Sequence, residues 1–205
     1  MKRLLILSSS FTCLTLAAQT ATRLLPNPSF EEGEAHWSLA DRGMSKVAPE
    51  AARSGRLGLR VADDSARSGS SCRSSPVPAA PGKTYALRFW ARALDGVGAV
   101  GVYQQYFDAE GRNLTTPERN GEIIAVVPAG AADWRAFTLY GKAPAKAAAL
   151  AVWIHAFDAE LGKADLDDFS VEELSDQEAA RVLRDGLLGS GGGFPAPDPD
   201  RKSVV

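Results

Sequence analysis

The stretch LAVWIH at residues 150–155 alternates between aliphatic residues and other residue types. Its large aliphatic members share one side of an extended chain: Leu150, Val152 and Ile154. Trp153 and His155 share the other side. Because successive side chains of a β-strand point to opposite faces, this alternation predicts a strand with one packed face and one face turned to solvent or ligand.

A second stretch with the same period is YALRFWA at residues 85–91. Its apolar side consists of Tyr85, Leu87, Phe89 and Ala91. The polar side carries Trp90, between Arg88 and Arg92. Shorter runs of the same kind predict further strands at residues 57–61, 100–107, 122–127, 134–140 and 164–171.

Turns that contain Gly or Pro separate these runs, for example Pro81-Gly82 and Asp95-Gly96. Many short strands at this spacing predict an all-β fold, an antiparallel two-sheet β-sandwich. The alanine-rich residues 145–150 favour a helix by propensity, but the alternation that continues from them favours a strand. We expect large apolar residues to form the core: Phe30, Leu59, Leu87, Phe89, Val152, Ile154 and Phe169, with the rings of Trp37 and Trp134 packed there too.

The N-terminus predicts a cleaved secretory signal peptide at residues 1–18. Lys2 and Arg3 precede an apolar run that ends in the small residues Ala17 and Ala18, as in such peptides. A membrane anchor is the alternative, but a spanning helix needs about 20 apolar residues, and serines interrupt this run. We therefore expect a secreted, periplasmic or cell-surface protein in which Cys72 is the one remaining cysteine.

The C-terminus predicts a short helix at residues 174–188 and a flexible tail at residues 189–205. Ser175 is a typical N-cap, and Glu178 three residues later completes a capping box. The tail starts with glycines and holds three prolines among mixed charges, a composition typical of disorder.

The overall composition is that of a folded, water-exposed domain. The chain is 45% hydrophobic and 23% charged, and its net charge is −2, which is close to the globular average. The absence of a basic block argues against nucleic acid as a partner. No further segment is apolar enough to predict a membrane span.

Several motifs occur in a fixed order along the chain. LPNPSFEEG at residues 25–33 is followed by Trp37, PGKTY at residues 81–85 by FWAR, and LDDFSV stands at residues 166–171. This order resembles the jelly-roll carbohydrate-binding modules of families four, nine and twenty-two. The resemblance covers residues 24–173, and it implies a non-catalytic module that binds polysaccharide of the β-glucan or xylan class.

The resemblance also implies a structural Ca²⁺ ion that joins the first and last strands. The matching positions are Glu31, Glu50, the Arg53 carbonyl and Asp167. Calcium takes six to eight oxygen ligands, so carboxylates from separate segments suit it. The alternative is that these carboxylates are solvated or paired with arginine.

Sugar binding requires flat aromatic rings for stacking and polar groups for the hydroxyls. Residues with this chemistry are expected to form the ligand site: Trp153, His155, Tyr103, Gln105, Tyr106 and Trp90. The alternative for each aromatic residue is that it covers a hydrophobic patch.

Two other functions remain open from the sequence. A glycoside hydrolase needs two carboxylates facing one cleft, and the candidates are Glu118, Glu122, Asp158 and Glu160. None of these forms a recognisable catalytic motif, and we expect no catalytic domain in these residues. The third possibility is a protein-contact or adhesion module whose partner binds the C-terminal helix and tail.

Overall fold

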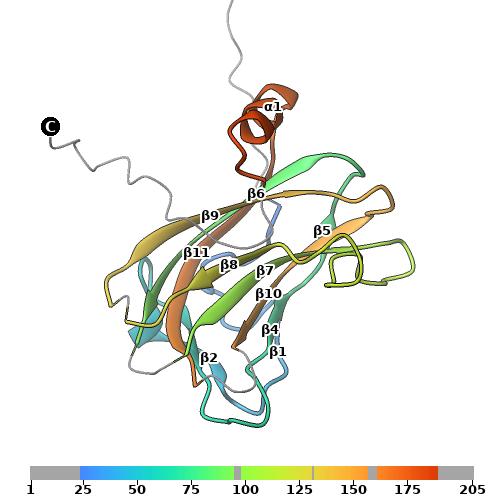
Figure 1. Cartoon of the computed structure of the whole chain (residues 1–205). Coiled ribbons are helices and arrows are strands. Elements are labelled where there is room, and N and C mark those ends of the chain that lie inside the picture. The colour runs from blue at the N-terminus through green and yellow to red at the C-terminus, as the bar shows by residue number, and fades with distance from the viewer. Residues whose placement is uncertain (1–23, 95–97, 131, 157–160, 189–205) are drawn as a thin grey trace, which may run out of the picture.

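The computed structural model describes residues 24–94, 98–130, 132–156 and 161–188, and they form two facing antiparallel sheets (Figure 1). The first, sheet A, has the order β1-β4-β10-β7-β8, with β5 also paired to β10. Its strands are β1 (Trp37–Leu39), β4 (Cys72–Ser74), β5 (Val77–Pro78), β7 (Val100–Phe107), β8 (Ile124–Val127) and β10 (Ala149–Ala156). The second, sheet B, has the order β2-β3-β11-β6-β9. Its strands are β2 (Ser45–Ala48), β3 (Gly58–Ala62), β6 (Thr84–Ala93), β9 (Arg135–Lys142) and β11 (Lys163–Glu173).

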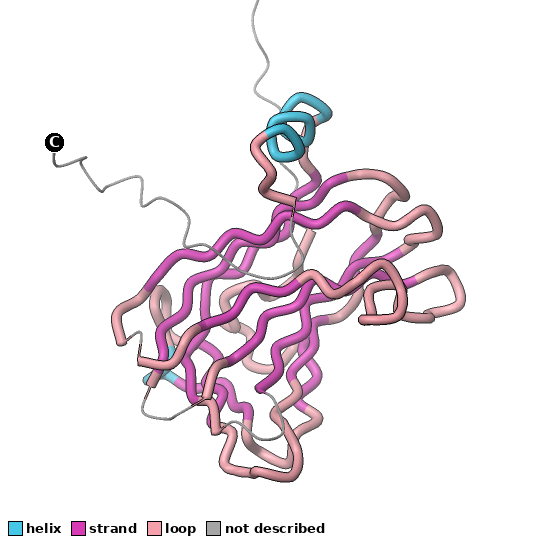
Figure 2. Tube along the Cα trace, viewed as in Figure 1, coloured by secondary structure: helices cyan, strands magenta, loops and turns pink. Residues whose placement is uncertain are grey.

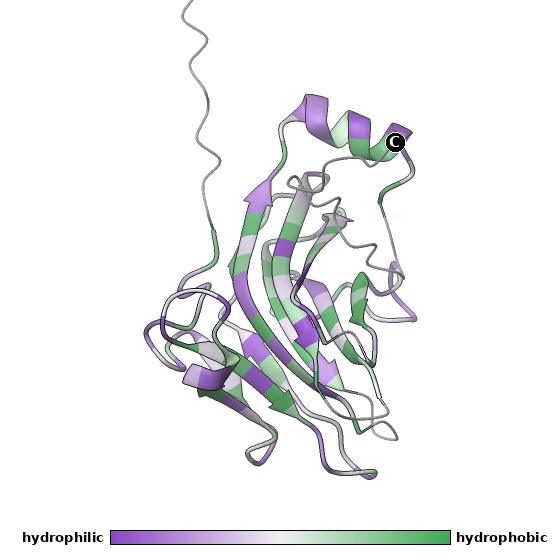
Figure 3. Cartoon of the chain, turned by 90° about the vertical axis from the view of Figure 1, so that its left-hand side faces the viewer, coloured by the Kyte–Doolittle hydropathy of each residue, from purple (hydrophilic) through white to green (hydrophobic). Residues whose placement is uncertain are grey.

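The predicted all-β sandwich is therefore confirmed, and strands dominate the chain (Figure 2). Hydropathy alternates along the strands, as Figure 3 shows. In β6 the inward side chains are buried while Arg88, Trp90 and Arg92 on the outer face are partly exposed. Residues 145–148 form a turn before β10 rather than a helix, as the alternation predicts.

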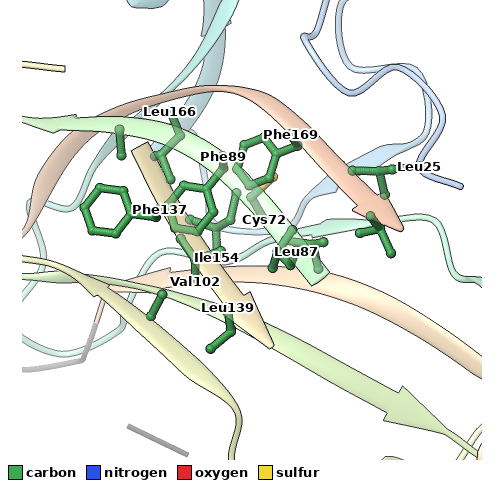
Figure 4. Packing of buried hydrophobic residues seen from close by; sticks show 14 of the residues in the cluster. Leu25, Cys72, Leu87, Phe89, Val102, Phe137, Leu139, Ile154, Leu166 and Phe169 are labelled. Carbon is green, nitrogen blue, oxygen red and sulfur yellow. The ribbon is translucent and has the colours of Figure 1, made fainter. Parts of the chain in front are cut away.

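Seven of the residues predicted for the core lie between the sheets and are each at most 2% exposed: Phe30, Leu59, Leu87, Phe89, Val152, Ile154 and Phe169. Figure 4 shows four of them, Leu87, Phe89, Ile154 and Phe169. Phe89 stacks on Phe137 with ring centroids 5.0 Å apart and on Phe169 at 5.3 Å. These contacts link β6, β9 and β11. Aromatic pairs of this kind add about 0.5 to 1.5 kcal/mol beyond the buried area.

The opening motif folds into a turn around Asn27. The side-chain amide nitrogen of Asn27 donates to the backbone carbonyls of Gly33 and Ala35, and its side-chain oxygen Oδ1 accepts the backbone amide of Glu32. The Trp37 indole N–H donates to the backbone carbonyl of Asn27 at 3.0 Å. This turn places Phe30 and Trp37 against Phe169 of β11, so the N-terminal segment closes one side of the core.

The prediction of core packing for Trp134 is wrong. Trp134 precedes β9 and is partly exposed, and the guanidinium carbon of Arg92 lies 5.0 Å from its ring centroid. Trp134 and Phe137 are an odd number of positions apart, so in extended backbone they point to opposite faces. The ring therefore meets an outer-face arginine instead of the core.

The predicted capping box is confirmed at α1 (Asp176–Arg184). Ser175 Oγ accepts the Glu178 amide, and the Glu178 carboxylate accepts the Ser175 amide. The helix lies at one end of the sandwich (Figure 1), where Val182 packs on Ala86 and Leu174. It leaves Leu183 63% exposed.

The predicted signal peptide at residues 1–18 and the predicted tail at residues 189–205 lie outside the described residues. Within the described ranges, no helix has the length and apolar character needed to span a membrane. The proposed protein partner of the helix and tail stays a prediction.

The core and surface aromatics provide a stability test. We expect Phe89→Ala to lower the free energy of unfolding by about 3 to 5 kcal/mol, because it leaves a cavity among packed rings. Trp134→Ala is the matched control and is expected to cost about 1 kcal/mol or less, since its main loss is one surface cation–π contact. Urea denaturation followed by tryptophan fluorescence and circular dichroism measures both. Equal losses would show that the placement of these two rings is wrong.

Candidate functional site

An aromatic row lies on the outer face of sheet A. In the strand register Trp153 of β10 stands opposite Tyr103 of β7, and their ring centroids are 4.8 Å apart. Trp153 also stacks on His155, with centroids 4.5 Å apart and an interplanar angle of 13°. Three of the predicted ligand residues are therefore in contact in one row, in which His155 covers one face of the Trp153 ring.

Hydrogen bonds fix two of these rings. The Trp153 indole N–H donates to Ser71 Oγ at 3.0 Å, and a ring nitrogen of His155 bonds the Ser70 carbonyl. Gly69 permits this approach, because a Cβ there would collide with the His155 ring and the Ala156 carbonyl. The segment before β4 thus holds the row in a defined orientation.

The rings differ in exposure. Trp153 and His155 are half-buried, whereas Tyr103 is only 3% exposed. Burial, followed by the negative charge of Glu122, raises the pKa of Tyr103 to about 12. The Tyr103 hydroxyl therefore stays protonated at neutral pH, and its ring supports Trp153 from the side more than it offers a surface of its own.

A hollow of about 460 Å³ adjoins this row at the edge formed by β1 and β4. Polar side chains line it: His36, Ser38, Ser71, Arg73 and Ser75. Arg73 lies opposite Trp153 in the register, with its guanidinium carbon 5.7 Å from the Trp153 ring centroid. The hollow therefore combines hydroxyl groups, one cation and an adjacent aromatic ring.

Sequence reasoning missed Ser71 and Arg73. The strand that carries Arg73, β4, has three residues, Cys72–Ser74, which is too short for a detectable alternation. Alternation of Cys72 inward and Arg73 outward is visible once the strand is known.

Gln105 joins the same face but is almost completely covered. It shares the outer face of β7 with Tyr103, and only 5% of it is exposed. Its Oε1 atom is buried and has no hydrogen-bond partner among the described residues. A buried amide oxygen without a partner costs about 1 to 3 kcal/mol, and its burial keeps this oxygen out of direct reach of a ligand on the surface.

Tyr106 does not belong to this face, which corrects the prediction. It is fully buried between the sheets, where its hydroxyl accepts from Gln104 and donates to the Gly141 carbonyl at 3.0 Å. The stretch YQQY is a single strand, so its members alternate. Tyr103 and Gln105 face outward, whereas Gln104 and Tyr106 face the core.

Trp90 is also separate from the aromatic row, because it lies on the outer face of sheet B. The Arg53 guanidinium covers its ring, with the guanidinium carbon 3.5 Å from the ring centroid. Arg53 in turn pairs with Asp168 at 2.8 Å. The covered ring face cannot stack on a sugar unless Arg53 moves away.

The residues predicted to bind calcium hold backbone amides instead. Glu31 Oε1 accepts the amides of Arg56 and Leu57 at 2.7 and 2.9 Å, and these bonds lower the pKa of Glu31. Asp167 Oδ2 accepts the amides of Arg53 and Ser54, and its Oδ1 accepts that of Asp168.

Glu50, a third predicted ligand, pairs with cations instead. Glu50 is exposed and pairs with Lys46 at 3.3 Å and with Arg60 at 3.6 Å. Among the described residues no group of three or more acidic, His or Cys side chains could hold a metal ion. A calcium ion would have to displace the amides, so the donor set does not fit it as it stands. Calcium stays a prediction.

The carboxylates considered for hydrolysis are only partly covered by the described residues. Asp158 and Glu160 lie outside the described residues. Glu118 is exposed, and its hydrogen bond with the Thr116 side chain lowers its pKa. A general acid for glycoside hydrolysis needs a raised pKa, so Glu118 has the opposite character.

No known protein-family model and no curated protein matches the sequence. Solved structures do match the fold. A structure described as "Family 16 Carbohydrate Binding Module-2" is 18% identical and covers 72% of this chain and 98% of its own, with a TM-score of 0.54. TmCBM61 in complex with β-1,4-galactotriose is 17% identical and covers 75% and 100%, with a TM-score of 0.52.

A third structure is the CBM22-1 xylan-binding domain from Paenibacillus barcinonensis Xyn10C. It is 17% identical and covers 78% of this chain and 99% of its own, with a TM-score of 0.54. Identities this low establish the fold alone. The described sandwich has the jelly-roll fold of carbohydrate-binding modules, which confirms the predicted resemblance at that level.

The role of Asp167 can be tested with and without calcium. We expect Asp167→Asn to lower the free energy of unfolding by about 1 to 3 kcal/mol, because a buried charged acceptor of three amides becomes neutral. The loss should be the same in calcium and in chelator. Thermal melts of both proteins in both buffers measure it, with Glu50→Gln as the control at an exposed position. A loss that appears only in calcium would instead establish a bound ion at this corner.

Proposed function

We propose that this chain is a secreted, non-catalytic carbohydrate-binding module that binds polysaccharide of the β-glucan or xylan class on the outer face of sheet A. The observation that carries the proposal is the row formed by Tyr103, Trp153 and His155 beside a polar hollow. Pyranose rings stack on such aromatic surfaces, and their hydroxyls need adjoining polar groups.

The shape of the site supports a saccharide more than a protein partner. The row offers one half-buried indole held by Ser71 rather than a broad apolar patch, and four of the nine residues that line the hollow next to it are serines. Protein interfaces usually have an apolar centre with polar groups at the rim. The fold shared with TmCBM61 and the xylan-binding domain is consistent with the proposal.

Secretion is part of the proposal and rests on the basic and apolar pattern of residues 1–18. A polysaccharide of this class lies outside the cell, so a protein that binds it has to be exported, as the predicted signal peptide would do. Intact mass measurement of the protein recovered from the extracellular or periplasmic fraction tests the cleavage.

Trp153→Ala tests the site. We expect it to weaken retention on insoluble xylan or β-glucan by about 1 to 3 kcal/mol, or about 5- to 150-fold in Kd, as for a central aromatic contact. Trp90→Ala is the matched control and should retain binding, because Trp90 lies on the other sheet. Depletion isotherms measure both proteins.

Circular dichroism and thermal melts must accompany these isotherms, because Trp153 is half-buried. Unchanged retention by a folded Trp153→Ala protein would remove this face as the binding site. Loss of binding in the Trp90→Ala protein with Trp153 intact would move the site to sheet B.

A further inference from the structure

Arg73 is a cation on β4, next to the aromatic row on the outer face of sheet A. Arg73 stands between Ser38 of β1 and Trp153 of β10 in the strand register, and it is exposed to solvent. Within the described part of the chain no carboxylate forms an ion pair with it, and none contributes to its pKa. Its guanidinium therefore keeps its full charge beside the Trp153 ring.

The arginines on the outer face of sheet B are different, because a carboxylate neutralises each of them. The pairs are Arg53–Asp168, Arg60–Asp165, Arg88–Glu172 and Arg92–Asp165. Arginine side chains on this protein are thus commonly balanced within the fold. Arg73, on the outer face of sheet A, forms no ion pair with the described residues, and neither do Arg42, Arg67, Arg119 and Arg135 at other places in the fold.

The guanidinium of Arg73 is partly desolvated, and an anionic ligand can offset the free-energy cost of this desolvation. Desolvation by neighbouring atoms lowers the pKa of Arg73, although a guanidinium stays protonated at any physiological pH. A partly desolvated charge without a counter-ion is unfavourable. Asp41 lies in this region, but its carboxylate already accepts the amides of Ser45 and Ser71 at 3.0 Å each.

We propose that the ligand is an acidic polysaccharide and that Arg73 binds the carboxylate of a uronic acid unit while a neighbouring sugar ring stacks on Trp153. This inference rests on the proposed function and adds the charge of the ligand to it. The planar guanidinium fork matches a carboxylate through two parallel N–H···O bonds. The hydroxyls of Ser38, Ser71 and Ser75 line the same hollow and suit the sugar hydroxyls.

The overall charge of the protein does not attract an acidic polysaccharide. The net charge of the chain is −2 at pH 7, so long-range attraction does not favour a polyanion. Retention of an acidic polysaccharide must then come from a specific cation at the site. Added salt should weaken it, since exposed charge pairs are screened.

The experiment compares a glucuronic acid-substituted xylan with the same xylan after chemical reduction of its carboxyl groups to alcohols. We expect the protein to bind the acidic xylan about 10- to 100-fold more tightly than the reduced one, as one charge-assisted bidentate contact provides. Arg73→Gln should abolish this difference and keep the weaker binding to the reduced xylan. Arg135→Gln, at an exposed position of β9, is the matched control and should keep the difference.

The outcomes separate this inference from the proposed function. Equal binding of the two xylans by the native protein overturns the acidic ligand and leaves the carbohydrate-binding module intact. Binding of neither xylan nor a β-glucan overturns the proposed function itself. The comparison of the two xylans uses the native protein, so it decides the question even if Arg73→Gln fails to fold.

Discussion

The two-sided geometry of the β-strand is the constraint on which both the core and the proposed site depend. In β10 the burial of Leu150, Val152 and Ile154 between the sheets forces Trp153 and His155 onto the outer face. The same alternation in β7 sends Tyr103 outward, opposite Trp153. A shift of register by one residue would exchange the two sets, so the packing of the core fixes the aromatic row.

This constraint also places polar groups inside the sandwich. Gln104 and Tyr106 point inward from β7, where the Gln104 amide, the Tyr106 hydroxyl and the Gly141 carbonyl form a hydrogen-bonded chain. Gln104 Oε1 is left without a partner. In the low dielectric of the core, an unpaired acceptor of this kind is unfavourable, whereas the satisfied members of the network are strengthened.

The N-terminal turn, residues 53–57 and β11 meet at one corner of the sandwich. The carboxylates there, which the sequence motif predicted to bind calcium, bind backbone amides. Glu31 and Asp167 accept backbone amides of that loop, and Asp168 accepts the Arg53 guanidinium and the Ser54 hydroxyl. The bonds of Asp167 and Asp168 join segments more than 100 residues apart in sequence, and those of Glu31 join segments about 25 residues apart. Burial raises the pKa of Asp167 in spite of its three amide donors, so desolvation outweighs the stabilisation that these amides give to the charged form.

The sequence by itself determined the all-β class, the longer strands, the capped helix and most of the core residues, because each of these follows from local periodicity or capping chemistry. It also placed Trp153, His155 and Tyr103 off the core. Only the tertiary structure decided that Trp90 lies on the other sheet, that Tyr106 faces inward, and that Arg73 from a three-residue strand adjoins Trp153. Which strands become neighbours depends on long-range packing, and periodicity within one strand carries no information about it.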